Sequence, residues 1–236
     1  METTQSSVDS DLFSSIVSRM THEKLDLLRM SATILVTLQE MMEFVQGVVV
    51  QLERSNHSPK TSCGSGCSYC CHSQINIIPV EALLIFSFIE TSFNLREIRD
   101  LKIKIQDNHL LTTGKTFAQK VAIKDQTPCV FLVKTGQCRI YSARPFICRS
   151  WHSFDKEACE AAFVSGNQDA EMEVFEARNY MFSTARKVFQ DLSIQMKIQT
   201  GIFKMPDAIG HCFLNATPLS SWLSGKAVFN ADFKGI

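Results

Sequence analysis

The spacing of apolar residues in the first part of the chain predicts a long helix. Between residues 28 and 52 the intervals alternate between three and four, which is the pattern of one helix face. The stripe consists of Leu28, Ser31, Leu35, Leu38, Met42, Val45, Val49 and Leu52. Ile34, Met41 and Val48 widen it on one side, which suits a helix in a bundle. We therefore expect the stripe to pack within the domain, with a dimer seam as the alternative. A shorter helix is expected before it, over residues 11–29.

Capping residues predict further helices. Pro79 fits the first turn of a helix over residues 80–89. Asn94, followed three residues later by Glu97, predicts a capped helix over residues 95–108. Residues 116–124 are expected to form another helix.

The second half of the chain carries similar signals. Ser153 or Asp155 can cap a helix that runs to Val164 and stops near Gly166. A longer amphipathic helix is expected over residues 169–196. Its apolar face comprises Met172, Phe175, Phe182, Ala185, Phe189, Leu192 and Met196. The tail from residue 201 carries no clear pattern.

Residues 128–141 differ in character from the helical segments. Two short β-prone runs, 130–133 and 138–141, flank a plausible turn at 134–137, so we expect a hairpin. A loop folded around a metal would give a similar pattern. The fold class expected is therefore mainly α: a helical bundle with an inserted cysteine-rich metal-binding loop and a short β-hairpin.

The polar run at residues 55–59 predicts a break after the first helices. We accordingly expect three parts. Residues 1–58 form an N-terminal helical segment, residues 59–165 a cysteine-cluster domain that binds zinc or iron, and residues 166–236 a C-terminal helix and tail that pack on it.

Charge and composition exclude several classes of function. The chain has 236 residues, with 24 Lys and Arg balancing 24 Asp and Glu. Zero net charge gives no broad attraction to nucleic acid or to an acidic membrane. The start has no signal-peptide pattern, and Glu40 and Glu43 interrupt the most apolar stretch, so no membrane span is expected. We expect a cytoplasmic protein whose thiols stay reduced.

Nine cysteines are the unusual feature, and eight of them lie between residues 63 and 159. They form two groups along the sequence: Cys63, Cys67, Cys70 and Cys71, then Cys129, Cys138, Cys148 and Cys159. Short gaps in a glycine-containing loop let thiolates converge on one ion or cluster. We predict all eight as metal ligands. Zinc, iron or an iron–sulfur cluster would suit these soft donors.

The number of sites stays open at this stage. Eight thiols could make two four-ligand sites, with the adjacent Cys70 and Cys71 divided between them, or one of these two could lie outside the ligand set. Cys212 stands apart from both groups and is expected to be a buried apolar filler.

Basic residues beside the cysteines suggest further roles. Arg139, Arg144 and Arg149 could neutralise a net-negative thiolate site, or could be ordinary surface residues. His72 and His152 each lie close to a cysteine, yet a lone histidine is more often structural than a ligand. No nucleotide-binding fingerprint or serine nucleophile motif is present, so no catalytic residue can be named.

Taken together, these motifs resemble the YkgJ-type cysteine-cluster family. Its opening block is matched by Cys63-x3-Cys67-x2-Cys70-Cys71-His72, although the first gap is three residues rather than two. Its second block is matched by the segments 128–132, 136–141 and 144–149, and Glu81 resembles a glutamate in the helix between the blocks. The resemblance covers residues 60–165 and implies a zinc- or iron-chelating domain.

Three functions remain as hypotheses. The first is metal binding with no catalysis implied. The second follows from the similarity of the cysteine pattern to flagellin lysine-N-methylase, and is an iron–sulfur-dependent enzyme. The third is a module that binds a protein partner, or a second copy, through the N-terminal helix. The triplet of Cys63, Cys67 and Cys70 also matches radical S-adenosylmethionine enzymes, but the strand–helix repeats of their barrel are not evident.

Overall fold

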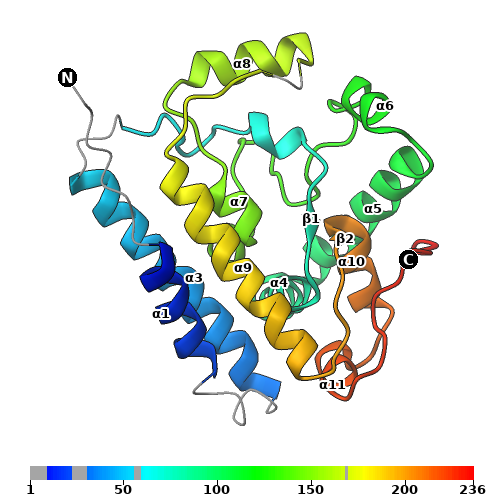
Figure 1. The fold of residues 1–236 in the computed structure, drawn as a ribbon. Helices are drawn as coiled ribbons and strands as arrows, with labels where there is room; N and C mark the ends of the chain where they lie inside the picture. The colour runs from blue at the N-terminus through cyan, green and yellow to red at the C-terminus, as the bar shows by residue number, and fades with distance from the viewer. Residues whose placement is uncertain (1–9, 23–30, 56–59, 168–169) are drawn as a thin grey trace.

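The computed structural model describes residues 10–22, 31–55, 60–167 and 170–236, and within them the chain is mainly helical, as predicted (Figure 1). The α-helices are α1 (Ser10–His22), α3 (Ser31–Ser55), α4 (Pro79–Ser92), α5 (Leu95–Thr112), α6 (Phe117–Ala122), α7 (Phe146–Ser150), α8 (Lys156–Ser165), α9 (Glu176–Gln195), α10 (Met205–Phe213) and α11 (Pro218–Leu223). Short 3-10 turns, η1 (Tyr69–His72) and η2 (Tyr141–Ala143), and two strands, β1 (Asn76–Ile77) and β2 (Phe203–Lys204), complete the described elements.

Helix α9 packs against helices from both the N-terminal part and the middle of the chain. It contacts α1 and α3 on one side and the short α7 on another, while α3 also packs on α4 (Figure 1). One hydrophobic cluster draws residues from α3, α4, α9 and the C-terminal tail. The cysteine-bearing segments therefore rest on a continuous core rather than on an isolated loop.

The apolar stripe of α3 is buried inside the molecule. Leu38, Met42, Val45 and Val49 are at most 1% exposed, which confirms the prediction that the stripe packs within the domain. Leu28 and the rest of 23–30 lie outside the described residues, so the expected helix over 11–29 is seen only as α1. By length and composition, residues 33–55 would also suffice to cross a membrane, a test that core helices pass as well. Packing on α4 and α9 accounts for the apolar face.

The local capping signals are confirmed. Pro79 occupies the first turn of α4. Asn94 Oδ1 accepts the Glu97 N–H at 3.0 Å, and Glu97 Oε2 accepts the Asn94 N–H at 2.9 Å, which closes a capping box at α5. Asp155 caps α8, and Gly166 ends it with a φ of +67°. These helix ends were specified by residues adjacent in sequence.

The start of α9 differs from the prediction. The expected helix over 169–196 begins at Glu176, and residues 170–175 before it have no regular secondary structure. The Phe175 N–H donates to His152 Nε2 at 2.6 Å, and the Phe154 N–H donates to the Glu173 carbonyl oxygen at 3.2 Å. These two hydrogen bonds tie residues 173–175 to residues 152–154, and the helix begins only after them.

The predicted hairpin is reduced to a tight antiparallel turn. Leu132 and Cys138 form a single bridge, and the Gly136 N–H donates to the Val133 carbonyl at 2.9 Å. The regular two-stranded sheet lies elsewhere: β1 and β2 pair antiparallel, with Asn76 opposite Lys204. Strand β2, α10 and α11 belong to the tail that the sequence pattern left unassigned, and β1 joins that tail to the segment after η1.

Candidate metal centre

The first cysteine motif is a loop fastened at both ends. At its start, Ser62 donates from N–H to the Ser153 carbonyl at 2.9 Å and from its hydroxyl to the Phe154 carbonyl. Within it, the Cys67 N–H donates to the Gly64 carbonyl at 3.1 Å, and Gly66 has a φ of +89°, which favours glycine. The loop ends in η1, which carries Cys70 and Cys71.

The turn between Cys129 and Cys138 packs directly against this loop. A Cβ added to Gly136 would lie 2.8 Å from the Gly66 carbonyl oxygen, so the two backbones touch without room for a side chain. Gln137 Nε2 donates to Ser65 Oγ at 2.9 Å, and the Cys129 N–H donates to the Cys71 carbonyl at 2.7 Å. These contacts join residues that are 58 to 72 positions apart in the sequence.

Cys129, Cys138 and Cys148 pack against the hydrophobic core. Burial and then the like charges of Cys138 and Cys70 together raise the pKa of Cys129 to about 12. Burial also raises the pKa of Cys148 well above its usual value, with Cys129, Cys70 and Cys138 adding to the effect. The three thiols and Cys70 are therefore mutual neighbours.

Cys70 lies next to Cys71. A hydrogen bond with the Cys71 side chain, followed by burial, raises the pKa of Cys70, while Arg144 opposes the rise. Arg144 likewise lowers the pKa of Cys138 and Cys148 against the larger effect of burial. Its positive charge thus faces three thiols.

The guanidinium of Arg144 also carries an unsatisfied donor. Its Nε is buried and has no hydrogen-bond partner in the described part of the chain, while the group stacks 3.8 Å from the centre of the Tyr141 ring. A buried N–H without an acceptor is costly. Thiolates carrying net negative charge would compensate this cation, which is a point of fit with a metal–thiolate centre.

Cys63, Cys67 and Cys159 form a different neighbourhood. The pKa of Cys63 is raised by burial and then by Cys67, Cys70 and Cys159 as like charges. Burial, Glu160, Cys67 and Cys159 similarly raise the pKa of Tyr69. Cys159 comes from α8, which packs on η1. The fourth cysteine of the second sequence group therefore lies with the first group in space.

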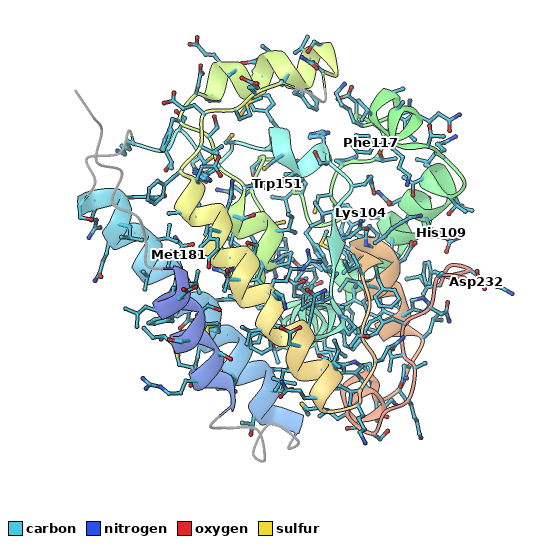
Figure 2. The ribbon with its side chains drawn as sticks, viewed as in Figure 1. Lys104, His109, Phe117, Trp151, Met181 and Asp232 are labelled. Carbon is cyan, nitrogen blue, oxygen red and sulfur yellow. The ribbon has the colours of Figure 1, made fainter. Side chains whose placement is uncertain are left out.

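A cavity of about 460 Å³ opens beside these thiols. Its walls include Cys63, Cys67, Cys70 and Cys159, and contributions come from η1, α6, α8 and residues 170–174. Phe117 and Trp151, both labelled in Figure 2, also line it. Sequence reasoning did not find this cavity, because its walls meet only through tertiary packing.

Charged residues in the cavity wall have one sign. Lys120 and Lys124 line the cavity, and no Asp or Glu does so among the described residues. Lys124 Nζ lies 4.8 Å from the centre of the Phe163 ring, and its carbonyl oxygen lies 3.2 Å from His72 Nδ1. The cavity is thus apolar and aromatic with a cationic side.

The remaining basic residues near the cysteines are structural. Arg139 pairs with Glu97 on α5 at 2.8 Å. Arg149 donates to the carbonyl oxygens of Arg144, at 2.8 Å, and Ser142. The hydrogen bonds named here go to oxygen atoms and not to thiols, whereas the charge of Arg144 lies close to three thiols.

The two candidate histidines also differ. Both ring nitrogens of His152 are engaged by backbone groups, Nδ1 with the Ser150 carbonyl at 2.8 Å and Nε2 with the Phe175 N–H, and burial lowers its pKa. His152 is therefore a neutral structural residue. His72 has Nδ1 3.2 Å from the Lys124 carbonyl oxygen, and both histidines line the cavity.

Glu81 connects the helix after the first motif to α7. Its side chain is fully buried, with Oε2 accepting the Ile78 N–H at 2.9 Å and Oε1 accepting the Phe146 N–H at 2.7 Å. Arg186 of α9 lies 3.7 Å from Oε2, yet burial dominates and raises the pKa of Glu81. Because Phe146 begins α7, the carboxyl group fixes the helix that carries Cys148.

The cysteine sulfur atoms suit a soft metal, but in this structure they do not surround a common point. All nine cysteines are free thiols, and Cys212 is buried in the core, apart from the others. Among the described residues, no three Cys, His, Asp or Glu side chains form a ready-made cage around one point. Zinc and iron both favour thiolates, so the thiols would turn toward an ion as it binds.

Comparison with known proteins gives one match. A family model described as "CxxCxxCC: Putative zinc- or iron-chelating domain" matches residues 62–166. Neither the curated proteins nor the solved structures yielded a match. The matched segment begins just before Cys63 and ends just after α8, so it contains all eight clustered cysteines.

Proposed function

Because residues 62–166 match the family model described as "CxxCxxCC: Putative zinc- or iron-chelating domain", we propose that the clustered thiols of this chain are the ligands of a metal centre. The observation that carries the proposal is the buried Nε of Arg144, which has no hydrogen-bond partner among the described residues and belongs to a cation close to Cys70, Cys138 and Cys148. With the thiols protonated this donor has no partner, and with metal-bound thiolates it has a counter-charge.

The eight clustered cysteines are the proposed ligands. A metal ion would link thiols from the first cysteine loop, from the turn between Cys129 and Cys138, and from α7 and α8, so binding should contribute directly to the stability of residues 62–166. All the cysteines are free, which suits a reducing compartment, and we propose a cytoplasmic location on that ground.

An iron–sulfur-dependent enzyme is the second candidate. The cavity favours it, because open space lined by aromatic side chains and lysines lies directly beside four cysteines. A purely structural centre has no need of such a space. Partner binding through α3 gains no comparable support, since the stripe that would serve it is buried against α4 and α9.

The test is metal content in protein purified without air or chelator. We expect stoichiometric zinc or iron, with broad visible absorbance if the centre is iron–sulfur. Cys148→Ser should lower the metal content, because a hydroxyl binds soft metals poorly. Cys212→Ser is the matched control and should keep all the metal. Protein that contains neither element, or a Cys212→Ser variant that alone loses it, would contradict the proposal.

A further inference from the structure

The eight clustered thiols lie in two different surroundings, and the inference drawn from this rests on the proposal that they bind metal. We infer that the chain holds two separate metal sites: a closed site formed by Cys70, Cys129, Cys138 and Cys148, and an open site formed by Cys63, Cys67 and Cys159 in the wall of the cavity. The grouping differs from the order along the sequence, where Cys159 follows Cys148 and Cys70 follows Cys67.

Three ligands of the closed site are defined by contact with the core, and the fourth, Cys70, lines the cavity but is carried to the other three by η1. Cys129, Cys138 and Cys148 pack against the hydrophobic cluster, and none of them lines the cavity. The Cys129 N–H donates to the Cys71 carbonyl, which brings η1 and therefore Cys70 to the same place. Four thiolates complete the tetrahedral set of a structural zinc site.

The open site is defined by the cavity. Cys63, Cys67 and Cys159 all line it, and none packs against the hydrophobic cluster. Cys159 Sγ lies 3.8 Å from Met172 Sδ, and Cys63 Sγ lies 4.0 Å from the Ser153 carbonyl oxygen. Cys159 and Cys63 therefore contact residues 172 and 153, which lie in segments that carry no ligand of the closed site.

Electrostatic neighbours agree with this division. The pKa of Cys148 is raised by burial and by the nearby thiols of Cys70, Cys129 and Cys138. The pKa of Cys63 is raised by burial and by those of Cys67, Cys70 and Cys159. Only Cys70 belongs to both sets, and it lies at the boundary between core and cavity. The division uses seven of the eight proposed ligands: Cys71 does not line the cavity and its side chain contacts Cys70, so here it supports Cys70 rather than binding metal itself.

Three protein ligands leave one coordination position open, which is the mark of zinc sites that bind an exchangeable ligand. Here the position would face a cavity with aromatic walls, two lysines and, among the described residues, no carboxylate. The chemistry of the wall favours a small organic anion with an apolar body. Azide is a convenient probe of such a position.

The test counts metal ions in the full-length reduced protein. Metal-free protein is loaded with Zn²⁺, and bound zinc is measured after desalting for wild type, Cys159→Ser and Cys138→Ser. We expect two equivalents in the wild type and one in each variant. A wild type that binds one equivalent, or a Cys159→Ser variant that still binds two, would overturn the division. A wild type that binds none would contradict the proposed function instead.

Two further measurements keep the inference testable if a variant folds poorly. In the wild type, a coloured chelator should remove zinc in two phases of one equivalent each, and a single phase would contradict two sites. After Co²⁺ loading, azide should shift the visible spectrum of Cys138→Ser, which keeps the open site, and leave Cys159→Ser unchanged. The reverse pattern would show that the open position belongs to the core-packed thiols.

Discussion

Gly136 stands at the contact between the two cysteine-bearing segments, and replacing it with alanine tests whether that contact assembles the metal centre. Its φ is +77°, and a Cβ there would lie 2.8 Å from the oxygen and 3.3 Å from two carbons of Gly66. The atoms it meets are backbone, which cannot rotate away as the end of a side chain can. The loop and the turn must therefore separate.

The cost follows from these distances. Ordinary contact begins near 3.4 Å, so the oxygen must retreat by about 0.6 Å (3.4 − 2.8). A residue other than glycine in the left-handed region costs about 1–2 kcal/mol. Loss of the hydrogen bond between Gln137 and Ser65 adds about 1 kcal/mol. Gly136→Ala should thus destabilise the protein by about 2–3 kcal/mol.

The assay is urea unfolding, with zinc affinity measured by competition against a chelator. Gly64→Ala is the matched control, because nothing lies within 4 Å of its Cβ position and its φ is outside the left-handed region. We expect Gly136→Ala to lower both stability and zinc affinity while Gly64→Ala leaves them near wild type. Equal unfolding midpoints for the two variants would refute the reasoning.

Three other substitutions test separate parts of the structure. Arg144→Gln should weaken zinc binding by about 10–100-fold, as loss of supporting groups around metal ligands does, whereas Arg139→Gln should cost stability without changing affinity; equal affinities would argue against the counter-charge role. Glu81→Gln presents an NH₂ group to the Ile78 N–H or the Phe146 N–H and should lower the free energy of unfolding by about 1–3 kcal/mol, read from urea melts. Leu38→Asp buries an unpaired carboxylate, so it should unfold the whole domain rather than yield a folded monomer, as sedimentation and thermal melting would distinguish.

Features specified by neighbouring residues could be predicted from the sequence. The capping box of Asn94 and Glu97, the proline that opens α4 and the stop at Gly166 each depend on residues within one or two turns of each other. The stripe of α3 is periodic over 25 residues, so its burial followed from spacing alone. Such signals need no knowledge of the tertiary fold.

Features that depend on distant contacts could not be predicted. Met172 and Phe175 fit a helical period with the later apolar residues, yet their segment is not helical and forms hydrogen bonds with His152 and Phe154 instead. The pairing of β1 with β2 joins residues far apart in a stretch of only two residues each, too short for a pattern. In both cases tertiary contacts override local preference.

The spatial grouping of the thiols also depends on contacts between distant residues, so it could not be predicted from the sequence. Sequence order places Cys159 beside Cys148, but α8 returns to η1 and carries Cys159 to Cys63 and Cys67. Arg144 was one of three arginines with equal claims, and only the packing around its guanidinium distinguished it. The residue types indicated the chemistry, and the tertiary path of the chain decided which thiols meet.

Helix α8 has no buried residue along Lys156–Ser165. The ring centre of its Phe163 lies 5.6 Å from that of Tyr69 and 4.8 Å from that of His72. A helix docked by so little apolar area depends on other links to stay in place. A metal ion shared by Cys159 with Cys63 and Cys67 would supply that link. Amide hydrogen exchange should then mark α8 as a metal-controlled flap, which opens when the ion is removed while the amides of α9 stay protected.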